Sequence, residues 1–412
     1  MSGKFSIISL GCPRNLVDSE IVVSRLIKKG YSQVDIKNAK IILINTCAFI
    51  EDAKKESIAA ILEAIELKKK ASLNKIIVFG CLVQRYKTDL LSEFKDVDAF
   101  VGRIELDDNC IPGDKLTPKP YAYLKISEGC INRCSYCIIP KIKGRLVSRS
   151  VKSILKEVKS LDKAKIREIN LIGQDITSFG LRGQDLTFLL KKISKDLKYA
   201  RWIRLLYLHP RRINNSLLEE ISNNDKICKY IDLPVQHIND KILKAMNRRT
   251  TKEEILSLIA RIRTIIPNVA IRTSLIVGFP GETDEEFQEL VEFVKTVRFN
   301  RLGVFKYSQE EGTSAFNLTG QVPEKVKQSR FNTIMKLQKS ISFQLNKLFI
   351  GKQLDILIEE KSEDGFLGRT EFDAPEIDGA VYIKTKNKFK IGQIVKGKII
   401  DALEYDLIAE VK

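Results

Sequence analysis

The chain has 412 residues and a formal net charge of +18, and 44% of its residues are hydrophobic. This length and composition suit two to three globular domains. The apolar runs are only as long as strands, whereas a membrane span needs about 20 residues, and the first residues lack the pattern of a secretory signal. We therefore expect a cytoplasmic protein with no membrane partner.

Residues 1–116 alternate short apolar strands with amphipathic helices. We expect strands at Lys4–Leu10, Ile41–Asn45 and Lys75–Phe79. Pro13 can open a helix after the first strand, because the first helical turn needs no hydrogen bond from its nitrogen. The alternation predicts an open parallel sheet with helices on its faces.

The alternation starts again in residues 117–342, after a Thr-Pro-Lys-Pro link. Six strand–helix units predict an incomplete (β/α)6 barrel in place of the full eight-unit barrel. We expect its strands at Tyr121–Ile126, Glu168–Ile172, Trp202–Leu208, Tyr230–Val235, Ala270–Phe279 and Arg301–Tyr307. A long helix from about Pro323 to Phe349 leads out of this domain.

The last segment, residues 343–412, has a different pattern. Five short β-rich stretches are separated by Gly, Asp, Asn and Pro, which predicts a small antiparallel β-barrel of the kind that often serves as a binding module. The chain is therefore expected to form three domains, at 1–116, 117–342 and 343–412.

The cysteines are few but clustered. In a reducing compartment, clustered thiols indicate metal binding or catalysis more than disulfides. The chain has eight cysteines and only two histidines, His209 and His237, so any metal site must be built mainly from sulfur. His237 has no partner for proton transfer nearby in the sequence, which disfavours it as an acid–base catalyst.

Three of these cysteines form the closely spaced motif Cys130, Cys134 and Cys137, directly after the first strand of the predicted barrel. Barrels of this type place their chemistry at the carboxyl ends of the strands. Three such thiolates can hold three corners of a [4Fe–4S] cube and leave the fourth iron open. Zinc usually takes four ligands, often as two pairs, and no second pair or histidine is nearby.

A dispersed set, Cys12, Cys47 and Cys81, follows the three strands expected in the first domain. The carboxyl ends of parallel strands share one edge of a sheet, so these thiols are expected to converge on one site. The alternative is that they are small buried apolar residues.

The segment from Glu128 to Cys137 resembles the motif of the radical S-adenosylmethionine superfamily. In that superfamily the open iron binds the amino and carboxylate groups of S-adenosylmethionine, and one electron cleaves the sulfonium to a 5′-deoxyadenosyl radical. The resemblance implies that Tyr136 lies near the adenine. It also implies polar contacts to the cofactor from Gln174 and Asp175, at the end of the second barrel strand.

The segments SLGCPRNLVDSE, INTCAFIEDAKKES and VFGC, followed by that motif and a terminal barrel, resemble the methylthiotransferase family over essentially all 412 residues. The resemblance implies a second [4Fe–4S] cluster on Cys12, Cys47 and Cys81, and a terminal barrel of the TRAM type. Cys110 and Cys228 match no ligand of the family and are interpreted as structural or incidental.

Other segments, including YLKISEGC, RLGVFKYSQEEGT and GRTEFDAPEIDG, resemble the ribosomal-protein (RimO-type) branch of that family. The implied substrate is an aspartate of small-subunit ribosomal protein twelve, either free or within the ribosomal particle. The implied reaction uses two S-adenosylmethionine molecules, one as methyl donor and one as radical source. It also needs a sulfur donor and a one-electron reductant.

The charge distribution bears on the substrate. Residues 343–412 carry 11 Lys and Arg against 13 Asp and Glu, whereas a barrel that binds tRNA should be basic. This favours a basic ribosomal protein over tRNA. The acidic side chains behind this interpretation are Glu359, Glu360, Glu363, Asp364, Glu371, Asp373, Glu376 and Asp378.

Two other functions remain open. One is a methylthiotransferase of tRNA adenosine, which differs only in substrate. The other is a non-catalytic iron–sulfur protein for electron transfer, which the open-iron spacing of Cys130, Cys134 and Cys137 disfavours.

Overall fold

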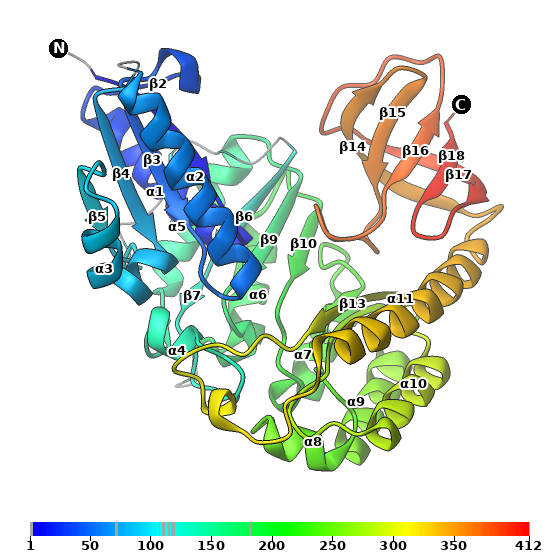
Figure 1. Ribbon diagram of the computed structural model, residues 1–412. Coiled ribbons are helices and arrows are strands. Elements are labelled where there is room, and N and C mark those ends of the chain that lie inside the picture. Colours follow the sequence, from blue (N-terminus) through cyan, green and yellow to red (C-terminus); the bar gives the residue numbers. More distant parts are fainter. Residues whose placement is uncertain are drawn as a thin grey trace.

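The computed structural model describes residues 3–70, 73–106, 108, 112–113, 116, 120–180 and 183–411. Cys110 and most of the predicted link, residues 117–119, lie outside the described residues. Figure 1 shows an N-terminal α/β domain, a central curved sheet covered by helices, and a C-terminal β-barrel. In the described part of the chain, no helix is long and apolar enough to cross a membrane.

The N-terminal domain is the expected open parallel sheet. Its strands are β1 (Lys4–Ser9), β2 (Ser32–Gln33), β3 (Ile41–Thr46), β4 (Lys75–Gly80) and β5 (Ala99–Val101), in the order β2-β1-β3-β4-β5. Its helices are α1 (Pro13–Lys28), α2 (Glu51–Lys69) and α3 (Cys81–Glu93). The short strands β2 and β5 were not expected, because two or three residues carry no recognisable alternation.

The central domain is the expected six-stranded parallel barrel, open on one side. Its strands are β6 (Tyr121–Lys125), β9 (Glu168–Ile172), β10 (Trp202–Leu205), β11 (Tyr230–Asp232), β12 (Ala270–Val277) and β13 (Arg301–Lys306). They pair as β6-β9-β10 and β11-β12-β13, and a parallel bridge between Ile203 and Ile227 joins the two halves.

Helices cover the outer face of this barrel. They are α5 (Val151–Lys163), α6 (Leu186–Asp196), α7 (Asn215–Asn223), α8 (Asp240–Ala245), α9 (Lys252–Ile265), α10 (Asp284–Val297) and α11 (Glu324–Lys347). Two short strands, β7 (Ser127–Glu128) and β8 (Val147–Ser148), and helix α4 (Ile139–Ile142) flank the loop that carries Cys130.

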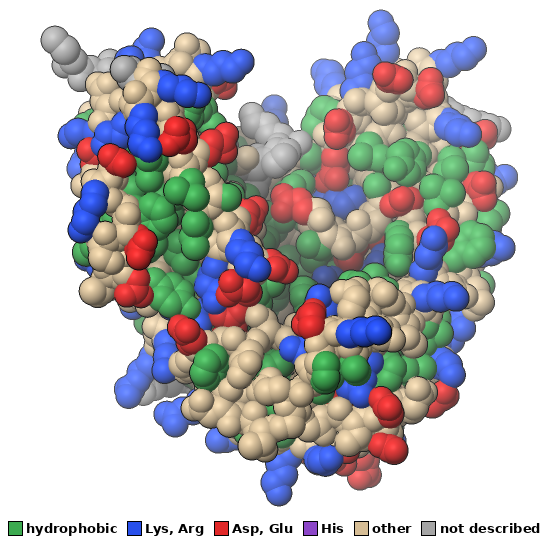
Figure 2. Space-filling view, viewed as in Figure 1, with side chains coloured by type: hydrophobic (Ala, Val, Ile, Leu, Met, Phe, Trp, Pro, Cys, Tyr) green, Lys and Arg blue, Asp and Glu red, His purple; other side chains and the backbone are tan. Residues whose placement is uncertain are grey.

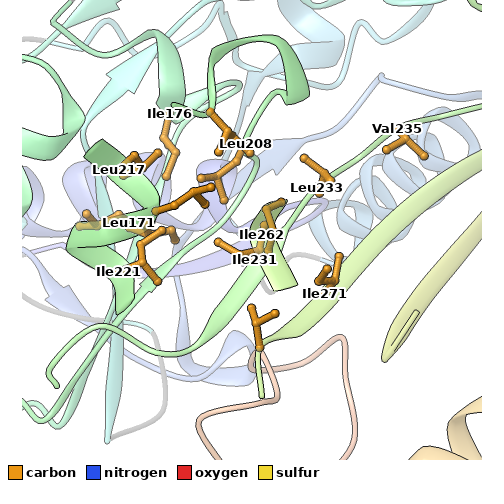
Figure 3. Packing of buried hydrophobic residues seen from close by; sticks show 14 of the residues in the cluster. Leu171, Ile176, Leu208, Leu217, Ile221, Ile231, Leu233, Val235, Ile262 and Ile271 are labelled. Atoms are coloured by element: carbon orange, nitrogen blue, oxygen red, sulfur yellow. The ribbon is translucent and has the colours of Figure 1, made fainter. Parts of the chain in front are cut away.

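The main hydrophobic core lies between the barrel strands and these helices. Figure 3 shows Ile231 and Ile271 on neighbouring strands, with Ile221 of α7 and Ile262 of α9 close to them. All four side chains are fully buried. Burying each such side chain contributes about 1.5–3 kcal/mol, so this core holds the strand ends in place.

The C-terminal domain is a closed five-stranded barrel, as expected. Its strands are β14 (Gln353–Ser362), β15 (Gly365–Arg369), β16 (Val381–Lys384), β17 (Ile394–Ala402) and β18 (Leu407–Glu410). They close in the order β14-β15-β16-β18-β17. The pairs are antiparallel except β16 with β18, which is parallel.

The chain between β15 and β16 reaches into the amino end of the central barrel. We call residues 369–378 the plug segment. Its side chains pair with residues at or near the starts of the barrel strands. These contacts join Arg369 to Glu168 (2.5 Å), Asp373 Oδ1 to Arg301 Nε (2.7 Å), Asp378 Oδ2 to Tyr230 Oη (2.6 Å) and Glu376 Oε1 to Tyr121 Oη (2.8 Å).

The plug segment overturns the charge argument made from the sequence. Asp373 is buried and Asp378 half-buried against the central barrel, and Glu359 pairs with Arg369. The side chains left exposed on residues 350–411 are balanced. They are Lys352, Lys361, Lys384, Lys386, Lys388, Lys390, Lys396 and Lys398 against Asp355, Glu360, Glu363, Asp364, Glu376, Asp401, Glu404 and Glu410. The exposed charges of the described residues of this barrel therefore do not by themselves favour a basic substrate.

Candidate functional site

The three N-terminal cysteines lie at one edge of the sheet. Cys12 caps α1 after β1, Cys47 directly follows β3, and Cys81 is the first residue of α3 after β4. These strands are neighbours and parallel, so their carboxyl ends are adjacent. Gly11 shows how close the first two loops are, because a Cβ there would lie 3.0 Å from Cys47 Sγ.

Asn15 connects the three loops. Its amide nitrogen donates to the carbonyl oxygens of Leu10 and Thr46, both at 3.1 Å. Its amide oxygen accepts a hydrogen bond from the Cys81 thiol at 3.5 Å. One buried side chain therefore joins the segments before Cys12 and Cys47 to Cys81 itself.

Charge at this site comes from Arg14. Burial opposes ionisation of Cys12, but the Arg14 guanidinium and the backbone N–H of Asn15 outweigh it and lower the pKa of Cys12. Burial raises the pKa of Cys47 and raises that of Cys81 to about 12. The site therefore favours a thiolate at Cys12 most strongly.

The loop with Cys130, Cys134 and Cys137 contacts neighbouring backbone segments at Gly129 and at Ser135. Gly129 has φ +78°, and a Cβ there would lie 2.1 Å from the Arg145 carbonyl oxygen, so glycine is required. Within the loop, the backbone nitrogen of Ser135 donates to the Met246 carbonyl oxygen at 2.9 Å, and its hydroxyl donates to that of Ala245 at 2.7 Å.

Polar side chains donate hydrogen bonds to two sulfurs of this loop. Asn132 donates to Cys130 Sγ from its backbone nitrogen (3.4 Å) and its amide (3.5 Å). Arg248 Nη1 lies 3.7 Å from Cys134 Sγ. Such donors stabilise charge on sulfur and tune an iron–sulfur cluster that the sulfur holds.

The two predicted S-adenosylmethionine contacts at the end of β9 differ in their surroundings. Asp175 is buried, and its carboxylate accepts hydrogen bonds from Asn132 (2.8 Å), Ser178 (2.7 Å) and Arg212 (2.7 Å). The amide atoms of Gln174 are buried without a partner in the described residues. A buried, unpaired amide suits a bound polar ligand, whereas Asp175 already orients the cysteine loop.

Tyr136, predicted to lie near the adenine, has apolar surroundings. It packs against a buried cluster that includes Met246, Phe279 and Tyr307. The rings of Phe279 and Tyr307 meet edge to face with their centroids 5.2 Å apart. A planar, partly apolar group fits against such a surface.

Arg14 links the two cysteine sets across the domains. Its Nη1 donates to the Gly173 carbonyl oxygen at 3.0 Å, and its guanidinium lies 4.4 Å from the centroid of the Tyr207 ring. Its charge acts on Cys12 and Cys81 of the N-terminal domain and on Cys137 of the central domain. The charge of one guanidinium therefore acts on thiols of both sets.

The thiols fit clusters better than single ions. No three His, Cys, Asp or Glu side chains in the described ranges are placed to hold one metal ion. A cluster binds each cysteine through a different iron, so its ligands lie farther apart than those of one ion. The all-sulfur donor sets, the donors aimed at the sulfurs and the unpaired amide of Gln174 all fit an iron–sulfur cofactor and its ligand.

The remaining candidates have structural surroundings. His237 is fully buried, and its Nε2 lies 3.5 Å from Glu282, a carboxylate that also pairs with Arg330 at 2.7 Å. Cys228 is buried in a hydrophobic cluster, as expected for a structural residue. Burial and the charge of Arg248 lower the pKa of His209 to about 3.

The sequence interpretation missed Arg14, Asn15, Asn132, Arg212 and Arg248. A signal existed for three of them, since Arg14 and Asn15 directly follow Cys12-Pro13 and Asn132 lies inside the cysteine motif. Arg212 and Arg248 are far from the cysteines in sequence, and only the fold brings them together.

Comparison with known proteins identifies each part of the chain. Residues 124–294 match the radical SAM superfamily, residues 350–411 the TRAM domain, and residues 4–102 the uncharacterized protein family UPF0004. The ribosomal protein uS12 methylthiotransferase RimO of Thermoanaerobacter sp. is 47% identical, over 98% of this chain and 99% of its own. The RimO of Geotalea uraniireducens is 45% identical over 99% and 98%.

The chain belongs to the RimO family of methylthiotransferases. A further relative, the RimO of Clostridioides difficile, is 44% identical over 99% of this chain and 98% of its own. Membership in this family confirms the resemblance drawn from the sequence, and with it a radical S-adenosylmethionine enzyme.

Solved structures share the fold of this RimO-family chain at low identity. The radical S-adenosylmethionine methyltransferase TsrM from Kitasatospora setae, with cobalamin and a [4Fe–4S] cluster bound, has a TM-score of 0.55 and 12% identity over 86% of this chain and 81% of its own. The cobalamin-dependent radical enzyme OxsB has a TM-score of 0.51 and 13% identity over 82% and 56%.

Proposed function

We propose that this chain methylthiolates the β-carbon of an aspartate in small-subunit ribosomal protein twelve, uS12. The main support is Arg14, which contacts the central domain through the Gly173 carbonyl oxygen and whose charge acts on Cys12 and Cys81 of one cysteine set and on Cys137 of the other. Close relatives named as uS12 methylthiotransferases support the substrate. An unactivated β-carbon has no proton that a base removes at a useful rate, so a radical route fits this substrate.

The residues that would hold the cofactors form two sets. Cys130, Cys134 and Cys137 would hold one [4Fe–4S] cluster, and Cys12, Cys47 and Cys81 the second. When bound, the first would supply the electron that cleaves S-adenosylmethionine to the 5′-deoxyadenosyl radical, and the second the sulfur that accepts a methyl group from another S-adenosylmethionine.

The chain's own polar groups position these parts. Asn132 and Arg248 hold Cys130 and Cys134 through hydrogen bonds to their sulfurs. Gln174 offers an unpaired amide to the polar end of S-adenosylmethionine, and Tyr136 offers a ring to its adenine. Arg14 places positive charge between the two sets of thiolates.

The reaction also requires partners that the chain does not contain. A one-electron reductant must deliver electrons to the cluster on the loop of residues 130–137, which we call the radical loop. A sulfur donor must replace the sulfur transferred to each product. The substrate is uS12, free or within the ribosomal particle, and the cytoplasm, where ribosomes work, is the proposed compartment.

The test is methylthio transfer in vitro. The protein is reconstituted with iron and sulfide without oxygen and given S-adenosylmethionine, sulfide and reductant, with either uS12 or tRNA. Mass spectrometry is expected to find the methylthio group on a uS12 aspartate. Cys47→Ala and Cys134→Ala should each abolish product and lose about half of the bound iron, whereas the matched control Cys228→Ala should keep both.

Other results would change the assignment. If only a tRNA adenosine is modified, the substrate assignment is wrong and the proposed chemistry still holds. The balanced surface charge of residues 350–411 does not argue against a tRNA substrate. Normal iron content without release of 5′-deoxyadenosine would instead favour the electron-transfer alternative.

A further inference from the structure

A pocket of about 280 Å³ opens beside the radical loop and is lined mainly by arginines. Its walls come from the radical loop, the turn after β10 and the turn after α8. It is lined by Ile131, Asn132, Arg133, His209, Arg211, Arg212, Asn247, Arg248 and Arg249. Among the described residues, no Asp or Glu lines it.

Two of its five arginines are already engaged. Arg212 pairs with Asp175, and Arg248 donates to Cys134 Sγ and to the Pro234 carbonyl oxygen. Arg133, Arg211 and Arg249 are exposed, and within the described part of the chain none of them forms an ion pair. Three unpaired guanidiniums around one opening attract an anionic partner.

Two of the side chains that line this pocket contact cysteine sulfurs. Arg248 reaches Cys134 Sγ, and Asn132 reaches Cys130 Sγ at 3.4–3.5 Å. The third sulfur of the loop, that of Cys137, is the one on which the charge of Arg14 acts. The residues that line the pocket and Arg14 of the N-terminal domain therefore act on different cysteines of the loop.

We propose that Arg133, Arg211 and Arg249 form the docking site for an acidic protein that delivers single electrons to the radical loop. This inference rests on the proposed function, which needs a one-electron donor. In each delivery the carrier loses one electron and the iron–sulfur group gains it, with no bond formed or broken. Electron transfer weakens steeply with distance, and at this pocket one side chain separates the surface from a ligand sulfur.

Other anionic ligands fit less well. The predicted S-adenosylmethionine contacts Tyr136 and Gln174 do not line the pocket. The target aspartate must reach the space between the two cysteine sets, next to Arg14 and Cys137. Nucleic acid phosphates match the arginines but gain nothing from contact with residues that hold the sulfurs.

The experiment compares two reductants on the reconstituted holoenzyme. The probe is a reduced flavodoxin, a small acidic protein that carries single electrons. The comparison reductant is reduced methyl viologen, a small cation that needs no docking site. The rate of cluster reduction is followed by freeze-quench electron paramagnetic resonance at low and high salt.

The variant carries Arg133→Glu, Arg211→Glu and Arg249→Glu. We expect its reduction by flavodoxin at low salt to be slower by roughly 10-fold or more, because steering by complementary charge raises association rates by about that factor. Its reduction by methyl viologen should be as fast as in the wild type. The matched control, Lys191→Glu, Lys195→Glu and Lys198→Glu, changes the same number of exposed charges on and beside α6 and should leave both rates unchanged.

Several results would overturn the proposal. One is an unchanged rate of cluster reduction by flavodoxin in the arginine variant. Another is a rate of reduction by methyl viologen that falls as much as the rate by flavodoxin. A third is a loss of ribosomal RNA binding while the rate of reduction by flavodoxin stays normal. If the triple variant binds less iron, Arg211→Gln with Arg249→Gln provides the same comparison with an unaltered cysteine loop. Failure of methyl viologen to reduce the wild type would contradict the proposed function itself, which separates the two failures.

Discussion

Asn15 shows how one side chain can build a site for three cysteines. Backbone carbonyls before Cys12 and Cys47 would be left without partners at the sheet edge, and the Asn15 amide satisfies both. The same side chain faces the Cys81 thiol. Because these atoms are buried, their hydrogen bonds fix the spacing of the loops as well as stabilise them.

Replacing Asn15 with alanine should therefore destabilise the apo-protein. The buried carbonyl group of Thr46 and the half-buried one of Leu10 would lose their donor, which costs about 1–3 kcal/mol in the free energy of unfolding. Urea unfolding at pH 7 measures this loss, and iron analysis after reconstitution should show less iron bound. The control Asn387→Ala changes an exposed side chain and should alter neither quantity, and an equal effect of both variants would contradict the role of Asn15.

At the scale of elements, helix α1 is attached to the central barrel by a buried group of four charges. Asp18 of α1 contacts Lys125 of β6 and lies 2.9 Å from Lys143, and both lysines also face Glu128. Burial alone would raise the pKa of Asp18, but the two lysines outweigh it and lower that pKa. Two acids and two bases thus balance each other where the N-terminal domain meets the barrel.

This group predicts a specific dependence of stability on pH. An aspartate with a lowered folded pKa contributes stability that is complete above its unfolded pKa of about 3.9 and is lost as the pH falls through the folded value. Asp18→Asn should cost about 3–5 kcal/mol at pH 7, because it leaves two buried lysines with one carboxylate. Urea unfolding should show this difference shrinking only below about pH 4.

The control for that prediction is Asp35→Asn, which changes an exposed aspartate in the same domain. It corrects for the general effect of acid on the unfolded chain and should have little effect at any pH. A difference between wild type and Asp18→Asn that stays constant down to pH 3 would contradict the assigned cause.

At the scale of the whole molecule, the sequence predicted the fold of each domain and the position of the cysteines at the carboxyl ends of strands. It did not predict how the domains contact one another. Strands and cysteines were predictable because alternation and strand-end position are local patterns. The contact of Glu168 with Arg369 spans 201 residues, and no local pattern indicates it. Asp373 was therefore interpreted as a surface residue, although it is buried against Arg301 at the start of a barrel strand.

The plug segment packs the C-terminal domain against the central barrel. Asp373 accepts hydrogen bonds from the guanidinium of Arg301 at the start of β13 and from the Thr370 hydroxyl at 2.8 Å. Tyr121, Tyr230 and Ala374 of the two domains share one hydrophobic cluster. Figure 2 shows the C-terminal domain separated from the N-terminal one by a hollow on this face.

Asp373→Ala should consequently destabilise the chain without disturbing the cysteine sites. Leaving the Arg301 guanidinium buried and unpaired costs about 3–5 kcal/mol, measured by urea unfolding. The bound iron should stay at the wild-type level, because the plug segment fills the amino end of the barrel and the cysteines lie at the carboxyl end.

A double variant distinguishes the loss of the Asp373–Arg301 ion pair from a general loss of stability. Arg301→Ala removes the buried charge that Asp373→Ala would leave unpaired, so the double variant should lose clearly less stability than the sum of the two single variants. The control Glu363→Ala, in the exposed turn before β15, should be neutral. Strict additivity would mean that Asp373 and Arg301 do not stabilise the fold as a pair, because charges that act as a pair cannot be removed independently.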